Sequence, residues 1–297
     1  MAAHSPNRPI VVGYDGSPPS EAALQWAARA ADHQKRPLTI LHAAERITYT
    51  QDAGSGLWKS EDVLAEAKEV AQFGADKVAD AFPDLEVETT SSLFSAKVAL
   101  GEVSTHASMV VLGSHGRGRI GTLLLGSTAY TIAGYSRCPV VIVRDGESEL
   151  PGPDLPVVVG TNATGGSQRA VETAIDVARD WGSPLVLATT WAPAPADPWD
   201  RGPAGYSSAA EASADYEAKA HEANAQMLAD VGEHQPDLKV GGKVLEGHPV
   251  DALSRAGEEG GLLVLGTRGH GTMAGSILGA TSLGVLHQAS APIMIVD

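Results

Sequence analysis

Met109-Val-Val-Leu-Gly113-Ser-His-Gly116, followed after nine residues by Gly126-Ser-Thr128, is the stretch of sequence that decides the fold. An apolar strand runs into closely spaced glycines and then into a helix that begins with hydroxyl residues. Backbone N–H groups at such a turn and helix N-terminus lack partners and suit phosphate. Because Leu263-Val-Leu-Gly266-Thr-Arg-Gly269 and Gly279-Ala-Thr281 repeat the spacing, the sequence predicts two such turns.

The recurrence belongs to an internal repeat that spans the whole chain. Val11-Val-Gly-Tyr-Asp15 aligns with Val158-Val-Gly-Thr-Asn162 at an offset of 147 residues, whereas Gly113 aligns with Gly266 at an offset of 153. Two fixed registers indicate duplication, and 297 residues suit two domains of ordinary size. The predicted domains are residues 1–146 and 157–297, joined by a proline-containing linker at 147–156.

Within the first half, short apolar runs alternate with helical patterns, which predicts a parallel sheet covered by helices on both faces. Ser17 is placed to cap the first helix, with Pro18 at its first position. Each half ends on an apolar strand that no helix follows, so we expect the halves to pair through these strands as an internal pseudo-dimer. The predicted strands are 10–13, 38–42, 85–90, 109–112 and 140–143; the predicted helices are 18–35, 60–82, 96–106 and one from about residue 122.

Charge and composition narrow the function classes. A net charge of −15 and a pI near 5.0 argue against nucleic acid or an anionic membrane as partner. The first 150 residues hold 13 Lys and Arg against 18 Asp and Glu, and the remainder 8 against 18, so charge favours the first half for a polyanionic ligand. One cysteine, Cys138, excludes an intrachain disulfide. With no apolar run near about 18 residues and no signal sequence, we expect a cytoplasmic protein.

Two familiar phosphate-binding patterns fail in the glycine loop. Residues 116–121 match G-x-G-x-x-G, but the dinucleotide fingerprint belongs after the first strand and needs an acidic residue about 20 positions on. Residues 121–127 have the glycine spacing of a P-loop without its lysine. Neither an NAD site nor a P-loop NTPase is supported.

The pattern G-x2-G-x9-G-[ST] resembles instead the universal stress protein family, specifically its tandem-domain, ATP-binding type. The likeness covers nearly the whole chain in two copies and includes Asp15 and the closing Cys138-Pro-Val-Val-Ile-Val143. It implies an α/β fold of two tandem Rossmann-like (adenine nucleotide α-hydrolase-like) domains, each a five-stranded parallel sheet sandwiched by helices. It also implies an ATP-binding regulator of stress or dormancy adaptation with little or no turnover, with Mg²⁺ accompanying the triphosphate.

The resemblance assigns roles to individual residues. It implies that Asp15 lies near the ribose and adenine, that Ala43 and its neighbour His42 line the adenine pocket, and that glycine amides and hydroxyls hold the phosphates. The expected nucleotide-binding residues are Gly13, Asp15, Ala43, Gly113, Gly116, Arg117, Gly126, Ser127 and Thr128 in the first half, and Gly160, Asn162, Thr190, Gly266, Gly269, Gly279, Ala280 and Thr281 in the second.

The second half departs from the pattern. Asn162 replaces the aspartate and Ala280 replaces the serine, although Thr281 and Ser282 are placed to compensate at the phosphates. We therefore expect ATP to bind the first half more tightly than the second. The first half departs at Phe94, where the second half has the glycine of a family-like turn, which alters one edge of the first pocket.

Other interpretations stay open or are weaker. A slow ATPase or nucleotidyl-transfer enzyme and a nucleotide-free scaffold for a regulatory protein are the alternative functions, and a homodimer is a further option. His115 and His270 lack partners at metal-ligand spacing, and no G-x-S-x-G is present, so neither metal ligands nor catalytic residues are expected. Cys138 fits a small buried thiol better than a redox sensor. Residues 191–203 are expected to form a surface loop rather than a cover over the second pocket.

Overall fold

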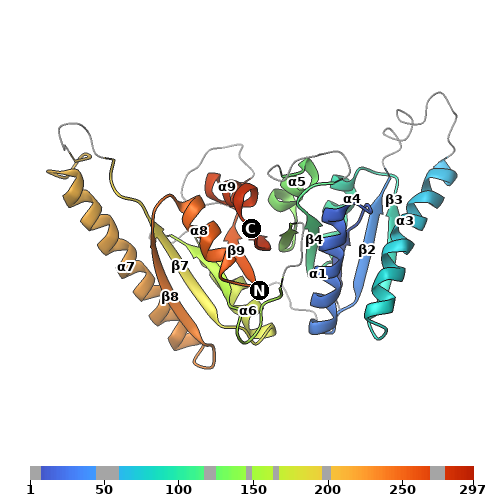
Figure 1. Ribbon diagram of the computed structural model, residues 1–297, viewed down its shortest axis with the longest axis horizontal. Coiled ribbons are helices and arrows are strands. Elements are labelled where there is room, and N and C mark those ends of the chain that lie inside the picture. Colours follow the sequence, from blue (N-terminus) through green and yellow to red (C-terminus); the bar gives the residue numbers. More distant parts are fainter. Residues whose placement is uncertain are drawn as a thin grey trace. The chain divides into compact units, whose positions relative to one another are not determined.

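The computed structural model describes residues 8–44, 60–116, 125–144, 149–162, 167–195, 202–267 and 278–297. The chain divides into two compact units, Met1–Leu150 and Pro151–Val296. Each unit is an α/β sandwich in which strands and helices alternate (Figure 1). The exact limits predicted for the domains and linker stay a prediction, as does the pairing of the halves through their last strands.

Unit 1 contains a five-stranded, all-parallel sheet in the order β3-β2-β1-β4-β5. This order reverses direction between β1 and β4, as in Rossmann-like folds. The predicted fold class is confirmed for this half. Its elements are β1 (Ile10–Gly13), α1 (Pro18–Gln34), β2 (Leu38–Ala43), α3 (Ser60–Ala81), β3 (Val87–Ser92), α4 (Ala96–Val103), β4 (Met109–Gly113), α5 (Ser127–Tyr135) and β5 (Val140–Val143).

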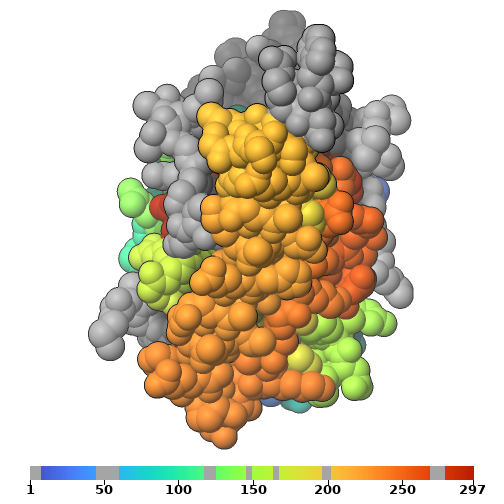
Figure 2. Space-filling model, turned by 90° about the vertical axis from the view of Figure 1, so that its left-hand side faces the viewer, coloured from blue at the N-terminus to red at the C-terminus, as the bar shows by residue number. Residues whose placement is uncertain are grey.

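Unit 2 repeats this topology with the order β10-β9-β6-β7-β8, again all parallel. Its longest helix, α7, packs on β7 and β8, and Figure 2 shows it in amber and orange along one side of the unit. The elements are β6 (Val157–Thr161), α6 (Gln168–Asp180), β7 (Leu185–Trp191), α7 (Ala209–His234), β8 (Val240–Glu246), α8 (Pro249–Glu258), β9 (Leu262–Gly266), α9 (Ala280–Gln288) and β10 (Ile293–Val296).

Helix α1 begins and ends as the sequence dictates. The Ser17 side chain caps it by accepting from Ser20 N, and prolines occupy its first two positions. At the other end Lys35 adopts the left-handed conformation, with φ 52°, and closes the helix. The corresponding position in unit 2 is Gly182, with φ 60°, so both copies require a left-handed residue here.

Opposite faces of the sheet carry different helices, as the alternation of side chains requires. A Cβ built at Gly13 would meet Leu100 of α4 and Leu112 of β4. The next side chain, Tyr14, packs instead against Gly74 of α3, which lies 3.0 Å from its ring when given a Cβ. Because α1 contacts α3 and α4 contacts α5, two helix pairs cover the two faces.

Three predicted boundaries were wrong. Strand β3 begins two residues later than expected because Leu85 N donates to Phe82 O in the turn that closes α3. Helix α4 stops at Val103 because the Ser104 hydroxyl donates to Gly101 O, a local bond that competes with the helix. The helix expected from about residue 122 begins at Ser127, since Gly126 is its extended N-cap; residues 117–124 lie outside the described residues.

Two further predictions concern the burial pattern of α3 and the segment at residues 191–203. In α3 the acidic side chains Glu61, Asp62, Glu66 and Glu69 are exposed and Val63 and Ala67 are buried, as predicted, whereas Val70 is only half-buried. In the segment expected to be a surface loop, Trp191 is the last residue of β7, and Ala194 is buried against α7 in a cluster with Ala209 and Ala212. Residues 196–201 lie outside the described residues. Within the described ranges, no helix is long and apolar enough to cross a membrane.

Candidate functional site

A cavity of about 340 Å³ lies in unit 1 at the carboxyl ends of β1, β2 and β4 and the start of α5. Ligands of open parallel sheets bind at this edge, where the strand order reverses, and the volume lies within the usual range for small-molecule sites. The predicted residues that line it together are Gly13, Asp15, Ala43, Gly113, Gly116, Gly126, Ser127 and Thr128. Arg117 lies outside the described residues.

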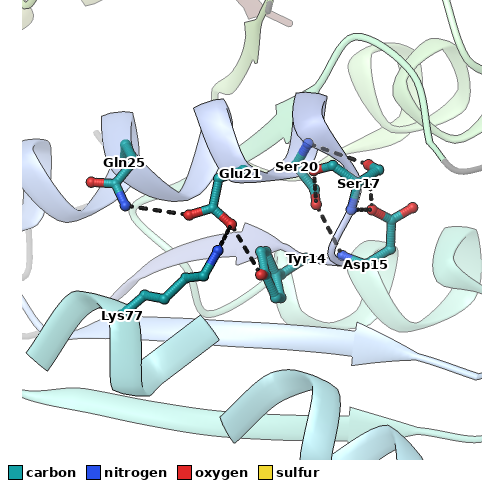
Figure 3. Close-up of polar contacts among 7 residues, drawn as sticks. All are labelled: Tyr14, Asp15, Ser17, Ser20, Glu21, Gln25 and Lys77. Carbon is teal, nitrogen blue, oxygen red and sulfur yellow. Dashed lines mark hydrogen bonds and ion pairs between the residues drawn. The ribbon is translucent and has the colours of Figure 1, made fainter. Parts of the chain in front are cut away.

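Asp15 is held at the rim of this cavity by the first turn of α1 (Figure 3). Its Oδ1 accepts from the backbone N of Ser17 at 2.9 Å and from the Ser17 hydroxyl at 2.5 Å. Its own backbone N donates to Ser20 Oγ at 3.3 Å, and that hydroxyl donates to Ser17 O at 2.9 Å. The carboxylate and the start of α1 are therefore one hydrogen-bonded assembly.

Tyr14 supports the same assembly, with its ring on the face of the sheet that α3 covers. Its hydroxyl donates to Glu21 Oε2 at 3.1 Å, and Lys77 of α3 reaches the same oxygen at 2.6 Å (Figure 3). Its carbonyl oxygen lies 2.7 Å from His42 Nδ1. Because a carbonyl can only accept, Nδ1 carries the hydrogen. These contacts fix the ends of β1 and β2, where the cavity opens.

The N-terminus of α5 supplies donors on the opposite side of the cavity. Gly126 N donates to Ser114 O at 2.7 Å, and the first bond of the helix runs from Tyr130 N to Gly126 O. Helix geometry therefore leaves the N–H groups of Ser127, Thr128 and Ala129 without an acceptor inside the helix. In the described part of the chain the hydroxyls of Ser127 and Thr128 also make no internal hydrogen bond. Donors and the positive end of the helix dipole thus face this end of the cavity.

The loop needs glycine at three positions because neighbouring atoms lie too close for a side chain. A Cβ at Gly113 would lie 2.5 Å from the backbone C and O of Pro19, and a Cβ at Gly116 would lie 2.8 Å from Asp15 Oδ2. A Cβ at Gly126 would lie 3.2 Å from His115 Cα, which is a tight contact. The loop therefore packs on the first turn of α1, and Gly116 brings it to the Asp15 carboxylate.

Several lining residues were not predicted from the loop motif. Ser20 and Leu41 were outside the motif, as were Leu100 and Leu112, which form an apolar wall. The position of Ser20 three residues after the cap Ser17 was the available signal. His115 also lines the cavity, with its Nδ1 3.0 Å from Ser114 Oγ. In the part of the chain that the structure describes, no three His, Cys, Asp or Glu side chains gather as metal ligands.

Unit 2 keeps the framework of this site. Gly279 N donates to Thr267 O at 2.7 Å, as Gly126 does to Ser114. A Cβ at Gly160 would lie 2.5 Å from Leu265 Cδ2, the same contact that Gly13 makes with Leu112. The expected residues Asn162, Thr190, Gly266, Gly279, Ala280 and Thr281 lie at the carboxyl ends of β6, β7 and β9 and at the start of α9, whereas Gly269 lies outside the described residues.

The side chains around that framework differ. The expectation that Ser282 compensates at the phosphates is wrong, because its hydroxyl donates to Gly266 O at 2.7 Å and the residue is buried. Behind the sheet, Thr161 and Thr189 lie at the positions of Tyr14 and His42 and share a 2.7 Å hydrogen bond. Asn224 of α7 donates to Thr189 Oγ1 at 2.9 Å. Unit 2 therefore replaces the Tyr14 and His42 contacts with a closed polar network.

Cys138 and Phe94, which the sequence also singled out, do not line the cavity. Burial raises the pKa of the Cys138 thiol above its usual range, although the Ser136 hydroxyl opposes the shift. A protonated, largely buried thiol agrees with the structural interpretation of this residue.

Phe94 is 66% exposed and does not appear in the cavity wall, and its backbone lacks the positive φ of 124° found at Gly247. The turns before α4 and α8 therefore differ in backbone conformation.

Comparison with known proteins identifies the family. The model of the universal stress protein family matches residues 6–144 and 155–297. A universal stress protein of Mycolicibacterium smegmatis is 31% identical over 291 residues, covering 97% of this chain and 96% of that protein. One from Mycobacterium tuberculosis is 30% identical over 301 residues, covering 96% of each. A universal stress protein structure from Archaeoglobus fulgidus superposes with a TM-score of 0.69 and 19% identity over 99% of both chains, which supports the fold. The chain belongs to the universal stress protein family and carries two tandem copies of its domain.

Proposed function

We propose that unit 1 binds ATP and that the chain is a nucleotide-dependent regulator with little or no catalytic turnover. One observation carries the proposal. A single cavity brings a positioned carboxylate, Asp15, opposite a helix N-terminus whose amides and hydroxyls have no internal acceptor. A ligand with hydroxyl donors at one end and a polyanion at the other matches this arrangement.

Asp15 suits the ribose end. A carboxylate has about four acceptor sites, so the bonds from Ser17 leave capacity for ribose hydroxyls. The apolar wall of Leu100 and Leu112 and the Ala43 position provide the surface against which the adenine would lie. The phosphates would then reach the amides of Ser127 and Thr128 at the start of α5.

Mg²⁺ would enter with the triphosphate. The hydroxyls of Ser127 and Thr128 are oxygen donors of the kind that this ion accepts, but phosphate oxygens and water would supply most of its ligands. Little turnover is expected because Asp15 is the only carboxylate among the described residues of the cavity wall and it faces the ribose end in this arrangement. Phosphate release in excess of bound nucleotide would favour the alternative, a slow ATPase or nucleotidyl-transfer enzyme.

Unit 2 is proposed to bind nucleotide weakly. Asn162 lacks the charge of Asp15, Ala280 lacks the hydroxyl of Ser127, and the Ser282 hydroxyl is already bonded to Gly266 O. A titration that counts two equal sites per chain would contradict this asymmetry.

The regulatory role rests on the family. A protein of this family is expected to act in stress or dormancy adaptation, in the cytoplasm, through a regulatory protein partner that reads nucleotide occupancy. Fold and family alone do not define a partner. The third function, a nucleotide-free scaffold, would require the cavity to remain empty in the presence of Mg-ATP.

The deciding experiment measures the nucleotide released by denaturing the full chain, purified without added nucleotide. The matched pair is Gly116→Ala, whose Cβ would meet Asp15 Oδ2 at 2.8 Å, and Gly152→Ala, whose Cβ would meet nothing within 4 Å. We expect close to one ATP per chain in the wild type and in Gly152→Ala, and loss of ATP in Gly116→Ala. No nucleotide in the wild type, even after incubation with Mg-ATP, would favour the scaffold.

A further inference from the structure

Helices α4 and α5 of unit 1 present an exposed apolar face. Phe94 is 66% exposed, Val98 is 54% exposed and Tyr135 is 61% exposed. Phe94 precedes the N-cap Ser95 of α4, Val98 lies in the first turn of that helix, and Tyr135 is the last residue of α5, which packs beside α4. We call these three residues the α4/α5 face. Exposed large hydrophobics grouped in this way are typical of interaction sites, whereas single scattered ones are ordinary.

The internal repeat shows that the fold does not need this apolar surface. At the offset of 153 residues, Val98 and Tyr135 correspond to Asp251 and Gln288. In unit 2 the Gln288 amide donates to Asp251 Oδ1 at 2.9 Å, which joins α8 to α9 at the surface. Gly247 stands where unit 1 has Phe94. The same helix pair is therefore built with polar residues in one unit and apolar residues in the other.

The repeat also indicates that Val98 and Tyr135 lie on the same side of this helix pair. Asp251 and Gln288 are bonded across α8 and α9, and α4 packs on α5 in the equivalent arrangement. Val98 and Tyr135 therefore form the centre of the α4/α5 face, with Phe94 four residues before Val98 in the chain.

Charge at this face favours a second copy of the chain as the occupant. Lys97 and Glu102 are exposed on α4 and, in the described part of the chain, neither side chain makes an ion pair. They lie five residues apart, about 7.5 Å along a helix, on either side of Val98 and Gly101. Gly101 is open, since a Cβ there would meet nothing within 4 Å.

A two-fold axis through this point makes the face complementary to itself. Two antiparallel copies of α4 would bring Lys97 of each copy opposite Glu102 of the other, with Val98 of one copy over Gly101 of its partner. The chain carries a net charge of −15, which opposes self-association in general, but Lys97 and Glu102 have opposite charges and add no negative excess at this face.

We propose that the chain forms a symmetric homodimer through the α4/α5 face of unit 1. Two copies of this face bury Val98 and Tyr135 from each chain at the centre and pair Lys97 with Glu102 at both rims. The proposal does not depend on nucleotide binding.

Sedimentation velocity of the full chain, at about 1 to 100 µM, where a small interface dissociates, tests the proposal. The first variant, V98D/Y135Q, installs in unit 1 the polar pair that unit 2 already uses, so the fold is retained and its thermal unfolding serves as the check. We expect the wild type to dimerise and this variant to dimerise at least about tenfold more weakly. Phe73→Gln removes an apolar side chain that is 57% exposed on α3, outside the face, and should dimerise as the wild type does.

Charge reversal tests the two-fold arrangement itself. K97E places like charges opposite each other at both rims and should weaken the dimer, whereas K97E/E102K restores opposite charges and should recover it at low salt. A wild type that stays monomeric at about 100 µM, or a dimer that V98D/Y135Q leaves unchanged, overturns the proposal. Failure of K97E/E102K to recover the loss overturns the two-fold pairing.

Discussion

Replacing Asp15 with asparagine should weaken adenine nucleotide binding while leaving the fold intact. The asparagine carbonyl oxygen can still accept the 2.9 Å bond from Ser17 N, so the turn before α1 persists. What disappears is the negative charge and, at the second oxygen, acceptor capacity. The substitution also reproduces the residue that unit 2 carries at Asn162.

The magnitude follows from the charge of the lost acceptor. A hydrogen bond to a charged group contributes about 1.5 to 3 kcal/mol, and about 1.4 kcal/mol corresponds to a factor of ten in the dissociation constant. Loss of this interaction with the ribose therefore predicts roughly 10- to 150-fold weaker binding. Removing a negative charge near the phosphates would act in the opposite direction, so the sign of the change reports which part of the ligand Asp15 faces.

Isothermal titration of the full chain with ATP and with adenosine separates the two cases. If Asp15 binds ribose hydroxyls, D15N weakens both ligands by a similar factor. Asp84, an exposed aspartate in the turn before β3, offers a control, since D84N changes the net charge equally and should leave both affinities unchanged. Tighter ATP binding by D15N, with adenosine unaffected, would refute the placement of Asp15 at the ribose.

Four other outcomes can be measured on the same protein. Lys35→Gly should raise the free energy of unfolding by about 1 kcal/mol, because the left-handed conformation with φ 52° is less favourable for lysine than for glycine. Gly182→Ala should lower the free energy of unfolding by a similar amount, and urea denaturation measures both changes. Gly113→Ala should lower that free energy by about 1 to 3 kcal/mol, since its Cβ would lie 2.5 Å from the Pro19 backbone; an unchanged urea midpoint would show that the loop can move away. Since burial raises the pKa of the Cys138 thiol, its reaction with a thiol reagent should be slow at neutral pH and accelerate only in alkaline buffer, whereas fast reaction at pH about 7 would mean an accessible thiolate.

The parts of the fold that the sequence predicted are those written in periodic or repeated patterns. The buried runs of β1, β4 and β5, the cap at Ser17 and the duplication all follow from local residue choice. The misplaced boundaries depend on hydrogen bonds between specific groups, such as Ser104 Oγ to Gly101 O, which hydrophobic periodicity does not encode. For this reason element type was predictable where element ends were not.

The cavity was predictable at its glycine and hydroxyl positions and much less so elsewhere. A spacing motif points to groups that contact phosphate, whereas Leu100 and Leu112 enter the wall only because the sheet and α4 bring them there. The same limit applies to Ser282, whose hydroxyl looks available in the sequence and is bonded to Gly266 O in the fold. Hydroxyls near a helix start can serve the backbone or a ligand, and only tertiary structure distinguishes the two uses.

The matching contacts of Gly13 with Leu112 and of Gly160 with Leu265 show which positions of the two copies can change residue without disturbing the fold. At both glycines an added Cβ would lie 2.5 Å from the Cδ2 of a leucine. The requirement to fold is therefore sufficient to retain glycine in both copies. The residues at two aligned positions of the site, Asp15 with Asn162 and Ser127 with Ala280, differ between the copies. In a duplicated chain of this kind, glycines shared by both copies reflect the packing of the sheet, whereas positions at which the copies differ are the place to look for a difference in ligand binding.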